Sequence, residues 1–352
     1  MNPDFRGYVP IVGAIIGRDV VVVAASAGGV EALRSLLGGL PGDLRAAVMV
    51  VLHISPRAGS ALPGILDRSG PLKAAAAQDG EPLRHGRVYV APPDLHLLLD
   101  GDAVRLSRGP RHNGHRPAAD PLFLSAAAFA GPRTLAVVLS GTLDDGARGC
   151  AQVESRGGLV AVQDPEESPF DGMPRAAIAA TARPMVAGLA DIAEWIVRQS
   201  DGAREVKGEA VDQELERELS PFYSAGALPR PPGDLSALTC PDCNGPLYEV
   251  PTSPNGHYQC IVGHAWSLES MIDGQGEAVE RAFWVTILRL EERLHLLTRM
   301  LSTAQRHGQT VTARWLRRQV EQDRDTVKAL RRLQSQSGWE SPVAVTEGDR
   351  RR

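Results

Sequence analysis

Three residues suited to hydrolytic chemistry stand directly after runs of small and β-branched residues. Ser26 follows "VVVVAA" and precedes a glycine pair, His53 ends "AVMVVLH", and Asp145 follows "LAVVLSGTLD". A hydroxyl to attack, an imidazole to take its proton and a carboxylate to orient the imidazole are the parts of a Ser-His-Asp triad. The three residues therefore predict an acyl hydrolase with Ser26 as nucleophile, His53 as base and Asp145 as acid.

Each position also has a simpler interpretation. A serine before glycines and an Asp-Asp-Gly sequence are both common in turns, and a histidine at a strand end is often structural. The setting of Ser26 would also suit a phosphate at a helix N-terminus. However, the Gly-rich and Gly-Lys-Ser/Thr patterns of nucleotide sites do not follow it. Asp144 is an alternative to Asp145, with a cap or turn as its expected role.

A second group of residues predicts a metal site. Cys240 and Cys243 are separated by two residues, Cys260 and His264 by three, and 16 residues lie between the pairs. This spacing matches a zinc ribbon with four tetrahedral ligands. Because such a site leaves no open position, the zinc is expected to be structural, and no cofactor is expected for catalysis. His257 is an alternative ligand.

The elements that must position the three triad residues are buried strands. From about residue 20 to 200, continuous apolar runs alternate with helical stretches, which predicts an α/β fold with a doubly wound, mostly parallel sheet. "LHLLLDGDAVRLSR" predicts an antiparallel hairpin within it. Since parallel strands end at the same edge of a sheet, Ser26, His53 and Asp145 are expected to converge there.

The remainder of the chain differs in composition. Residues 199–238 predict a charged and proline-rich linker, 239–268 the small zinc ribbon, and 275–337 a helical hairpin. A heptad seam predicts the hairpin, with a break at "RHGQT"; its members are Phe283, Ile287, Leu290, Leu294, Leu297 and Leu301, then Leu316, Val320, Val327 and Leu330. Self-association or partner binding through these helices remains the alternative.

Bulk properties narrow the class of protein. The chain has 352 residues, a net charge of −4 and four cysteines, three of them in the predicted zinc site. These values favour a cytoplasmic protein without a disulfide scaffold. No membrane insertion is expected, and no nucleic-acid partner, because the stretch between the two metal-ligand pairs contains no lysine or arginine.

With these residues in place, the chain resembles the catalytic domain of the CheB-type protein-glutamate methylesterases of chemotaxis over residues 18–198. Six motifs carry the resemblance in order: "AASAGGVEAL", "VVLHISP", "DGEPLRHGRVYVAPPDLHLLL", "HRPAADPLFLSAA", "VVLSGTLDDGARG" and "GGLVAVQDPEESPFDGMPRAAI". The resemblance implies that Ser26, His53 and Asp145 hydrolyse glutamate γ-methyl esters on a methylated, helical chemoreceptor-like protein. It implies glutamine deamidation by the same path. The family's phosphoacceptor receiver domain is not expected to control this chain, because none precedes the motifs.

Other positions are assigned from the same motifs. Thr142 stands where the family commonly has methionine, and its backbone N–H is expected to serve the oxyanion. Ala27 stands where the family commonly has threonine. Arg116 is expected either to bind a substrate carboxylate or to cap a helix, and His112 and His115 to be solvated loop residues. These departures leave open a non-catalytic adaptor with a degenerate esterase domain, which binds a receptor while its zinc and helical modules bind a partner.

Overall fold

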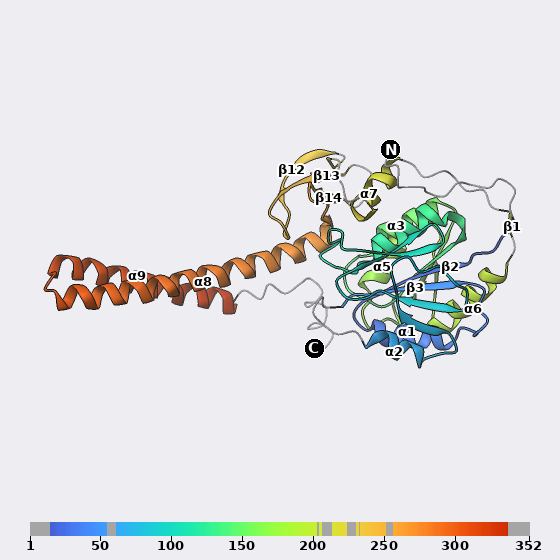
Figure 1. Ribbon diagram of the computed structural model, residues 1–352, viewed down its shortest axis with the longest axis horizontal. Coiled ribbons are helices and arrows are strands. Elements are labelled where there is room, and N and C mark those ends of the chain that lie inside the picture. The colour runs from blue at the N-terminus through green and yellow to red at the C-terminus, as the bar shows by residue number, and fades with distance from the viewer. Residues whose placement is uncertain are drawn as a thin grey trace. The chain divides into compact units, whose positions relative to one another are not determined.

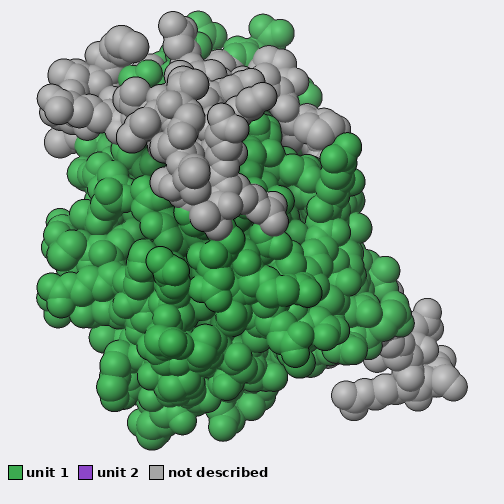
Figure 2. Space-filling model, turned by 90° about the vertical axis from the view of Figure 1, so that its right-hand side faces the viewer, with its two compact units in different colours: residues 1–270 green, residues 271–352 purple. Residues whose placement is uncertain are grey.

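The computed structural model divides the chain into two compact units, residues 1–270 and 271–352. Figure 2 shows one face of the first unit. The structure describes residues 15–54, 61–202, 204–205, 213–223, 230–231, 233–250 and 256–336. Parts of the predicted linker lie outside these ranges, namely 203, 206–212, 224–229 and 232, as do residues 251–255 of the predicted zinc ribbon and the last predicted hairpin residue, 337. No helix among the described residues is long and apolar enough to cross a membrane.

A seven-stranded parallel sheet forms the centre of the first unit (Figure 1). Its order is β10-β9-β8-β2-β3-β5-β4, with every neighbouring pair parallel. The strands are β2 (Val20–Ala25), β3 (Ala47–Leu52), β4 (Lys73–Ala76), β5 (Arg87–Val90), β8 (Thr134–Val138), β9 (Leu159–Gln163) and β10 (Met185–Ala187). The sheet confirms the predicted fold class, and it makes β2 a central strand between β3 and β8.

Helices cover both faces of this sheet, because side chains that alternate along each strand enter two separate cores. Val20, Val22 and Ala24 of β2 pack in one core, and Val21, Val23 and Ala25 in the other. The first core also contains residues of α3 (Ala119–Phe129), α4 (Ala147–Ser155) and α5 (Gly172–Ala180). The second contains residues of α1 (Gly29–Gly38), α2 (Leu62–Asp67) and α6 (Leu189–Asp201).

Shorter elements complete this part of the chain. The predicted hairpin is present as β6 (His96–Asp100) and β7 (Ala103–Ser107), which form an antiparallel pair separate from the main sheet. A short 3-10 helix, η1 (Gly131–Arg133), precedes β8, and β1 (Ile15–Ile16) pairs with β11 (Arg204–Glu205). Helix α7 (Gln213–Tyr223) adds Leu215, Leu219 and Phe222 to the first core.

The cysteine-containing segment folds as a four-stranded antiparallel sheet, which also belongs to the first unit. Its strands are β12 (Asp234–Thr239), β13 (Pro246–Glu249), β14 (His257–Cys260) and β15 (Ala265–Ser267). Each strand pairs with the next along the chain. Helix α8 (Leu268–Arg306) begins at the residue after β15.

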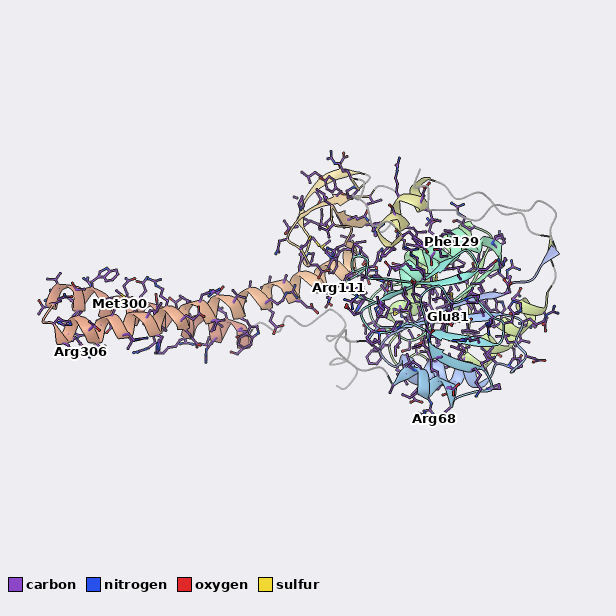
Figure 3. All side chains as sticks on the ribbon, in the orientation of Figure 1. Arg68, Glu81, Arg111, Phe129, Met300 and Arg306 are labelled. Carbon is purple, nitrogen blue, oxygen red and sulfur yellow. The ribbon has the colours of Figure 1, made fainter. Side chains whose placement is uncertain are left out.

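The second unit is a helical hairpin, as predicted, made by α8 and α9 (Thr310–Gln336). Gly308 has φ 67° in the turn, and Arg306 ends α8 beside it (Figure 3). Leu297, Ala304 and Leu316 lie in the buried seam between the helices. Five of the ten predicted heptad residues pack in this seam, because the break at the turn lets the second helix fold back on the first; they are Leu294, Leu297, Leu301, Leu316 and Val320.

Candidate active site

Ser26 is the first residue after β2, at the edge where the parallel strands end. Its backbone N–H donates to the carbonyl of Ser140 (3.0 Å), and its own carbonyl accepts from the N–H of Gly29, the first residue of α1 (2.9 Å). Between them Gly28 has φ 72°, a left-handed conformation that glycine adopts without steric cost. The half-buried Ser26 side chain thus stands between the end of the central strand and the start of α1.

His53 directly follows β3 and lies beside Ser26, because Ala25 and Leu52, the residues before them, are register partners. The His53 Nε2 atom is 2.7 Å from Oδ2 of Asp145, and these two side chains are only 6% and 2% exposed. Within the described ranges no hydrogen bond joins the Ser26 hydroxyl to His53. Since Nε2 faces the carboxylate, Nδ1 is the ring nitrogen available to the serine.

Asp145 receives hydrogen bonds on both carboxylate oxygens. Oδ2 accepts from His53 and from the backbone N–H of Ala119 (2.6 Å). Oδ1 accepts from the N–H of Asp120 (3.1 Å) and from the side-chain amide of Asn113 (3.2 Å). Burial alone would raise the pKa of Asp145, but the hydrogen bond and charge of His53, together with the N–H of Ala119, hold that pKa well below its ordinary value. Asp145 is therefore a fully ionised, firmly held carboxylate.

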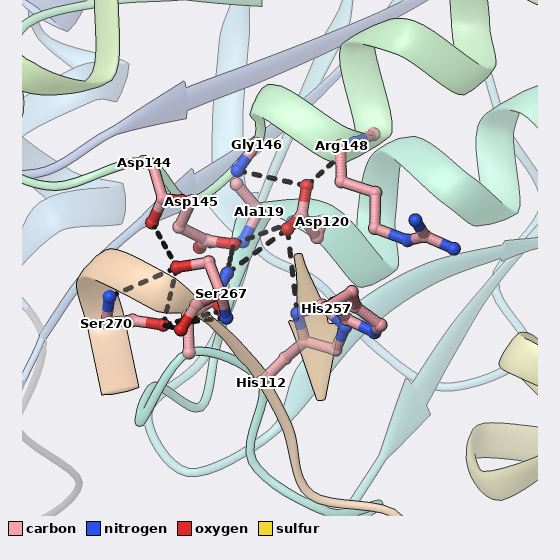
Figure 4. Close-up of polar contacts among 12 residues, drawn as sticks. His112, Ala119, Asp120, Asp144, Asp145, Gly146, Arg148, His257, Ser267 and Ser270 are labelled. Carbon is pink, nitrogen blue, oxygen red and sulfur yellow. Dashed lines mark hydrogen bonds and ion pairs between the residues drawn. The ribbon is translucent and has the colours of Figure 1, made fainter. Parts of the chain in front are cut away.

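The carboxyl groups of Asp120 and Asp144 have the opposite electrostatic character. Figure 4 shows both of them close to Asp145. Asp120 is 2% exposed and accepts from the N–H of Gly146 (3.1 Å). Burial and the charge of Asp145 raise the pKa of Asp120 well above its ordinary value. Asp144 accepts from the Ser267 hydroxyl (2.8 Å), and burial raises its pKa to about 6 against the opposing effect of that bond. Of the three carboxyl groups, Asp145 alone is shifted toward its charged form.

The loop after β8 brings backbone amides beside the nucleophile. A Cβ atom at Gly141 would lie 2.9 Å from Cβ of Ser26 and 2.2 Å from Sδ of Met173, so glycine is required for this close approach. Among the described residues, neither the N–H of Thr142 nor that of Ala27 has a hydrogen-bond acceptor. Two unpaired backbone donors next to a serine are suited to stabilise an oxyanion.

The expectation that His112 and His115 are solvated is wrong for His112, which is buried, while His115 is half-buried against His53. Asn113 and Gly114 have φ 52° and 76° and form a tight turn, so the two histidines pair across it through their backbones (3.1 and 2.9 Å). His112 is 2% exposed, and the His115 ring stacks on His53 at 3.9 Å with an 8° interplanar angle. Burial, with the adjacent His53, lowers the pKa of His115 to about 3. His115 is therefore a neutral ring that supports the imidazole of His53.

Neither Asn113 nor His115 is among the active-site residues predicted from the sequence. The Asn113–Gly114 dipeptide is the one local signal, because Asn-Gly favours a turn with two left-handed residues. That signal locates the turn but not its neighbours. Contact with Asp145 and His53 comes from tertiary packing of segments far apart in the chain.

Arg116 forms structural contacts within its own region. Its Nε and Nη2 donate to Oδ1 of Asp94 (3.0 and 2.7 Å), and its Nη1 donates to the carbonyls of Arg108 (3.2 Å) and Gly109 (2.9 Å). These bonds hold the segment after β7 against the turn after β5. The predicted contact of Arg116 with a substrate carboxylate stays a prediction.

The four predicted metal ligands come together in the antiparallel sheet. Nδ1 of His264 is 3.8 Å from Sγ of Cys240 and 3.5 Å from Sγ of Cys260, which is 3.6 Å from Sγ of Cys243. Ligands about 2.3 Å from a tetrahedral ion would be separated by about 3.8 Å. The donor set therefore fits a metal ion held by three thiolates and one imidazole.

His257, the alternative ligand, lies in a different buried cluster. Its Nε2 is 4.0 Å from Oε1 of Glu218, and the ring of His112 lies beside it, 5.7 Å between centroids. Arg148 donates two hydrogen bonds to Glu218 (2.7 and 2.8 Å) and, against the effect of burial, lowers the pKa of Glu218 to about 2. The guanidinium already neutralises this carboxylate, so the cluster is an ion pair joining α4 to α7, with His257 of β14 beside it.

Known proteins of one family are similar to this chain in sequence. The family model "CheB methylesterase" matches residues 21–196. A protein of Leptospira interrogans is 36% identical over 181 residues, which are 51% of this chain and 94% of that protein. Protein-glutamate methylesterase/protein-glutamine glutaminase 4 of Myxococcus xanthus is 40% identical over 185 residues, 52% of either chain.

Solved structures are also similar to part of this chain. The crystal structure of the Thermotoga maritima CheB methylesterase catalytic domain matches with a TM-score of 0.49 and 32% identity, covering 51% of this chain and 97% of that one. The matched region of this chain thus spans nearly all of the Leptospira protein and about half of the Myxococcus protein. The sheet of β12 to β15 and the hairpin of α8 and α9 lie beyond the region that the family model matches.

Proposed function

Because the chain belongs to the CheB methylesterase family, we propose that it is a serine hydrolase that demethylates glutamate γ-methyl esters on a chemoreceptor-like protein. Deamidation of glutamine on the same substrate would use the same site. The observation that carries the proposal is the buried His53–Asp145 hydrogen bond directly beside Ser26, on the neighbouring strand end.

The proposed reaction has two halves. Ser26 attacks the ester carbonyl while Nδ1 of His53 takes its proton, and Asp145 stabilises the imidazolium through Nε2. The N–H groups of Ala27 and Thr142 receive the oxyanion. His53 then returns the proton to the leaving methoxide, so methanol departs and an acyl-serine remains. Water, activated by the same imidazole, releases the glutamate carboxylate and restores Ser26.

The neutral state of the His115 ring is compatible with the positive charge that His53 acquires during the reaction. A charged ring stacked at 3.9 Å would repel the imidazolium that His53 becomes. Because the pKa of His115 is lowered to about 3, its ring stays uncharged at neutral pH and supports His53 without that penalty.

We assign the Cys240, Cys243, Cys260 and His264 cluster to a structural zinc ion, which when bound would tie β14 and β15 to the loop after β12. No residue of this cluster takes part in the ester chemistry. A cytoplasmic location stays a prediction.

Methanol release from a radiomethyl-labelled chemoreceptor tests the proposed activity. The full chain should release labelled methanol, and Ser26→Ala should reduce the release to background. If the wild type releases no more than Ser26→Ala while both proteins bind the receptor, the enzymatic assignment is wrong and the adaptor alternative is supported. Ser155→Ala, a substitution on the exposed end of α4, is the matched control and should keep full activity.

A further inference from the structure

We propose that Asn113 is a positioning residue for Asp145, and that it is itself held by the residues immediately after the metal cluster. The inference rests on the function proposed above and extends the active site to β15 and the start of α8. It concerns a residue whose side chain is 6% exposed and whose hydrogen bonds run in two directions.

The amide nitrogen of Asn113 faces the triad. It donates to Oδ1 of Asp145 (3.2 Å) and to Oδ2 of Asp120 (3.2 Å). The other donor to Oδ1 of Asp145 is a backbone N–H, that of Asp120. Asn113 is thus the one side chain besides His53 that donates to Asp145 among the described residues.

The amide oxygen of Asn113 faces the C-terminal segment. It accepts from the backbone N–H of Ser267 (3.1 Å) and from the hydroxyl of Ser270 (3.0 Å), a side chain that is 2% exposed. Ser267 and Ser270 also bond to each other through their hydroxyls (2.8 Å). These bonds fix which end of the amide is oxygen, because both of its contacts on that side are donors.

Backbone hydrogen bonds also connect the Asn113 loop to the segment after the metal cluster. The N–H of Asn113 donates to the carbonyl of Ala265 (2.8 Å), and the N–H of Ala265 donates to the carbonyl of Arg111 (3.3 Å). Ala265 directly follows His264, a member of the metal cluster. Figure 4 shows Ser267 and Ser270 close to Asp144 and Asp145. The strand that holds Asn113 therefore begins at the residue directly after the metal cluster.

The role of Asn113 follows from the motion that its hydrogen bond to Asp145 restrains. Asp145 must keep Oδ2 directed at His53, and a donor on Oδ1 opposes rotation of the carboxylate away from that direction. Asn113 can supply this donor only while its own amide is oriented, which Ser267 and Ser270 ensure from the opposite side. Removal of the Asn113 side chain should thus loosen the His53–Asp145 pair without removing any reacting group.

The test uses the full chain and the variant Asn113→Gly, because glycine keeps the left-handed turn at φ 52° and deletes only the side chain. The first measurement is the proton NMR resonance of His53 Nε2–H, which a hydrogen bond to a carboxylate moves to low field and which His53→Gln identifies by its loss. It should broaden or move toward its ordinary position in Asn113→Gly. The second measurement is methanol release, in which kcat should fall roughly tenfold with KM nearly unchanged.

Ser270→Ala separates a relay from a local packing effect. It removes one of two donors to the Asn113 oxygen, so kcat should fall roughly threefold. In the Asn113→Gly background the same change should have no further effect, because Ser270 acts through Asn113. Ser155→Ala should leave the resonance and kcat at wild-type values.

Two results would overturn the proposal: a His53 resonance in Asn113→Gly that matches the wild type, or a Ser270→Ala loss that is retained in full in that background. If Asn113→Gly does not fold, the resonance in Ser270→Ala decides alone, and an unchanged signal rejects the relay. The NMR readout needs no substrate. Failure of the wild type to release methanol would therefore reject the proposed function without deciding the role of Asn113.

Discussion

Asp144 provides a quantitative test of the electrostatics around the triad. Burial raises its pKa from the ordinary 3.8 to about 6. Between these two pH values the folded chain keeps a proton that the unfolded chain has released, so stability falls as pH rises through this window. A difference of about two pH units at 1.36 kcal/mol each corresponds to about 3 kcal/mol. The cost is absent below about pH 3, where Asp144 is protonated in both the folded and the unfolded chain, and complete above about pH 7.

Asp144→Asn removes this cost, because the amide cannot ionise and its oxygen can still accept from Ser267. Relative to the wild type, the variant should therefore gain about 3 kcal/mol more stability at pH 8 than at pH 3. Urea unfolding at the two pH values, with equal m-values required for the comparison, measures the difference. Asp43→Asn on the exposed surface makes the same change of charge and should match the wild type at both.

If Asp144→Asn gained the same stability at both pH values, the reasoning would be refuted. That result would show that Asp144 is ionised to the same extent in the folded and the unfolded chain. A loss of stability at pH 8 would also refute it. That result would mean that the charged form of Asp144 is the one that its bond with Ser267 stabilises.

Three further predictions concern the site and the metal cluster. Asp145→Asn should lower kcat for methanol release by about 10³–10⁴-fold while the fold is retained, because an amide cannot stabilise the imidazolium; a loss below tenfold would contradict the assigned role. Gly141→Ala should abolish most activity, since its Cβ would meet Met173 at 2.2 Å, and activity near wild type would show that the loop adjusts freely. Cys243→Ser should reduce zinc, counted by elemental analysis of native protein, from one per chain to well below one; less than one in the wild type would contradict the zinc assignment.

Much of the site could be predicted from the sequence, because all strands of a parallel sheet end at the same edge. Ser26 and His53 directly follow neighbouring strands, and Asp145 follows a strand on the other side of β2, so knowledge of the strand ends suffices to bring them to one edge. The cysteine cluster could be predicted for a different reason: the spacing of its ligands is a local pattern in the sequence.

The contributions of His115 and Asn113 to the site depend on tertiary contacts that no local sequence pattern predicts. His115 and Asn113 stand in a loop with several polar residues, which predicts exposure, yet the loop is covered by β15. The position of that strand is set by the packing of residues such as Trp266, whose ring lies beside Gly114, 3.4 Å from where a Cβ would stand. A sequence pattern describes the loop and the strand separately, and only the fold brings them together.

The position of β2 at the centre of the sheet has a consequence for the order in which the site is completed during synthesis. Ser26 and His53 leave the ribosome early and can pair through β2 and β3 as soon as both strands have emerged. Asp145 arrives much later, and the serines that hold Asn113 later still. Closing such distant contacts is slow compared with local pairing. A nascent chain would therefore carry its nucleophile and base long before Asp145, and the proposed hydrolase would reach full activity only after the serines that hold Asn113 had emerged.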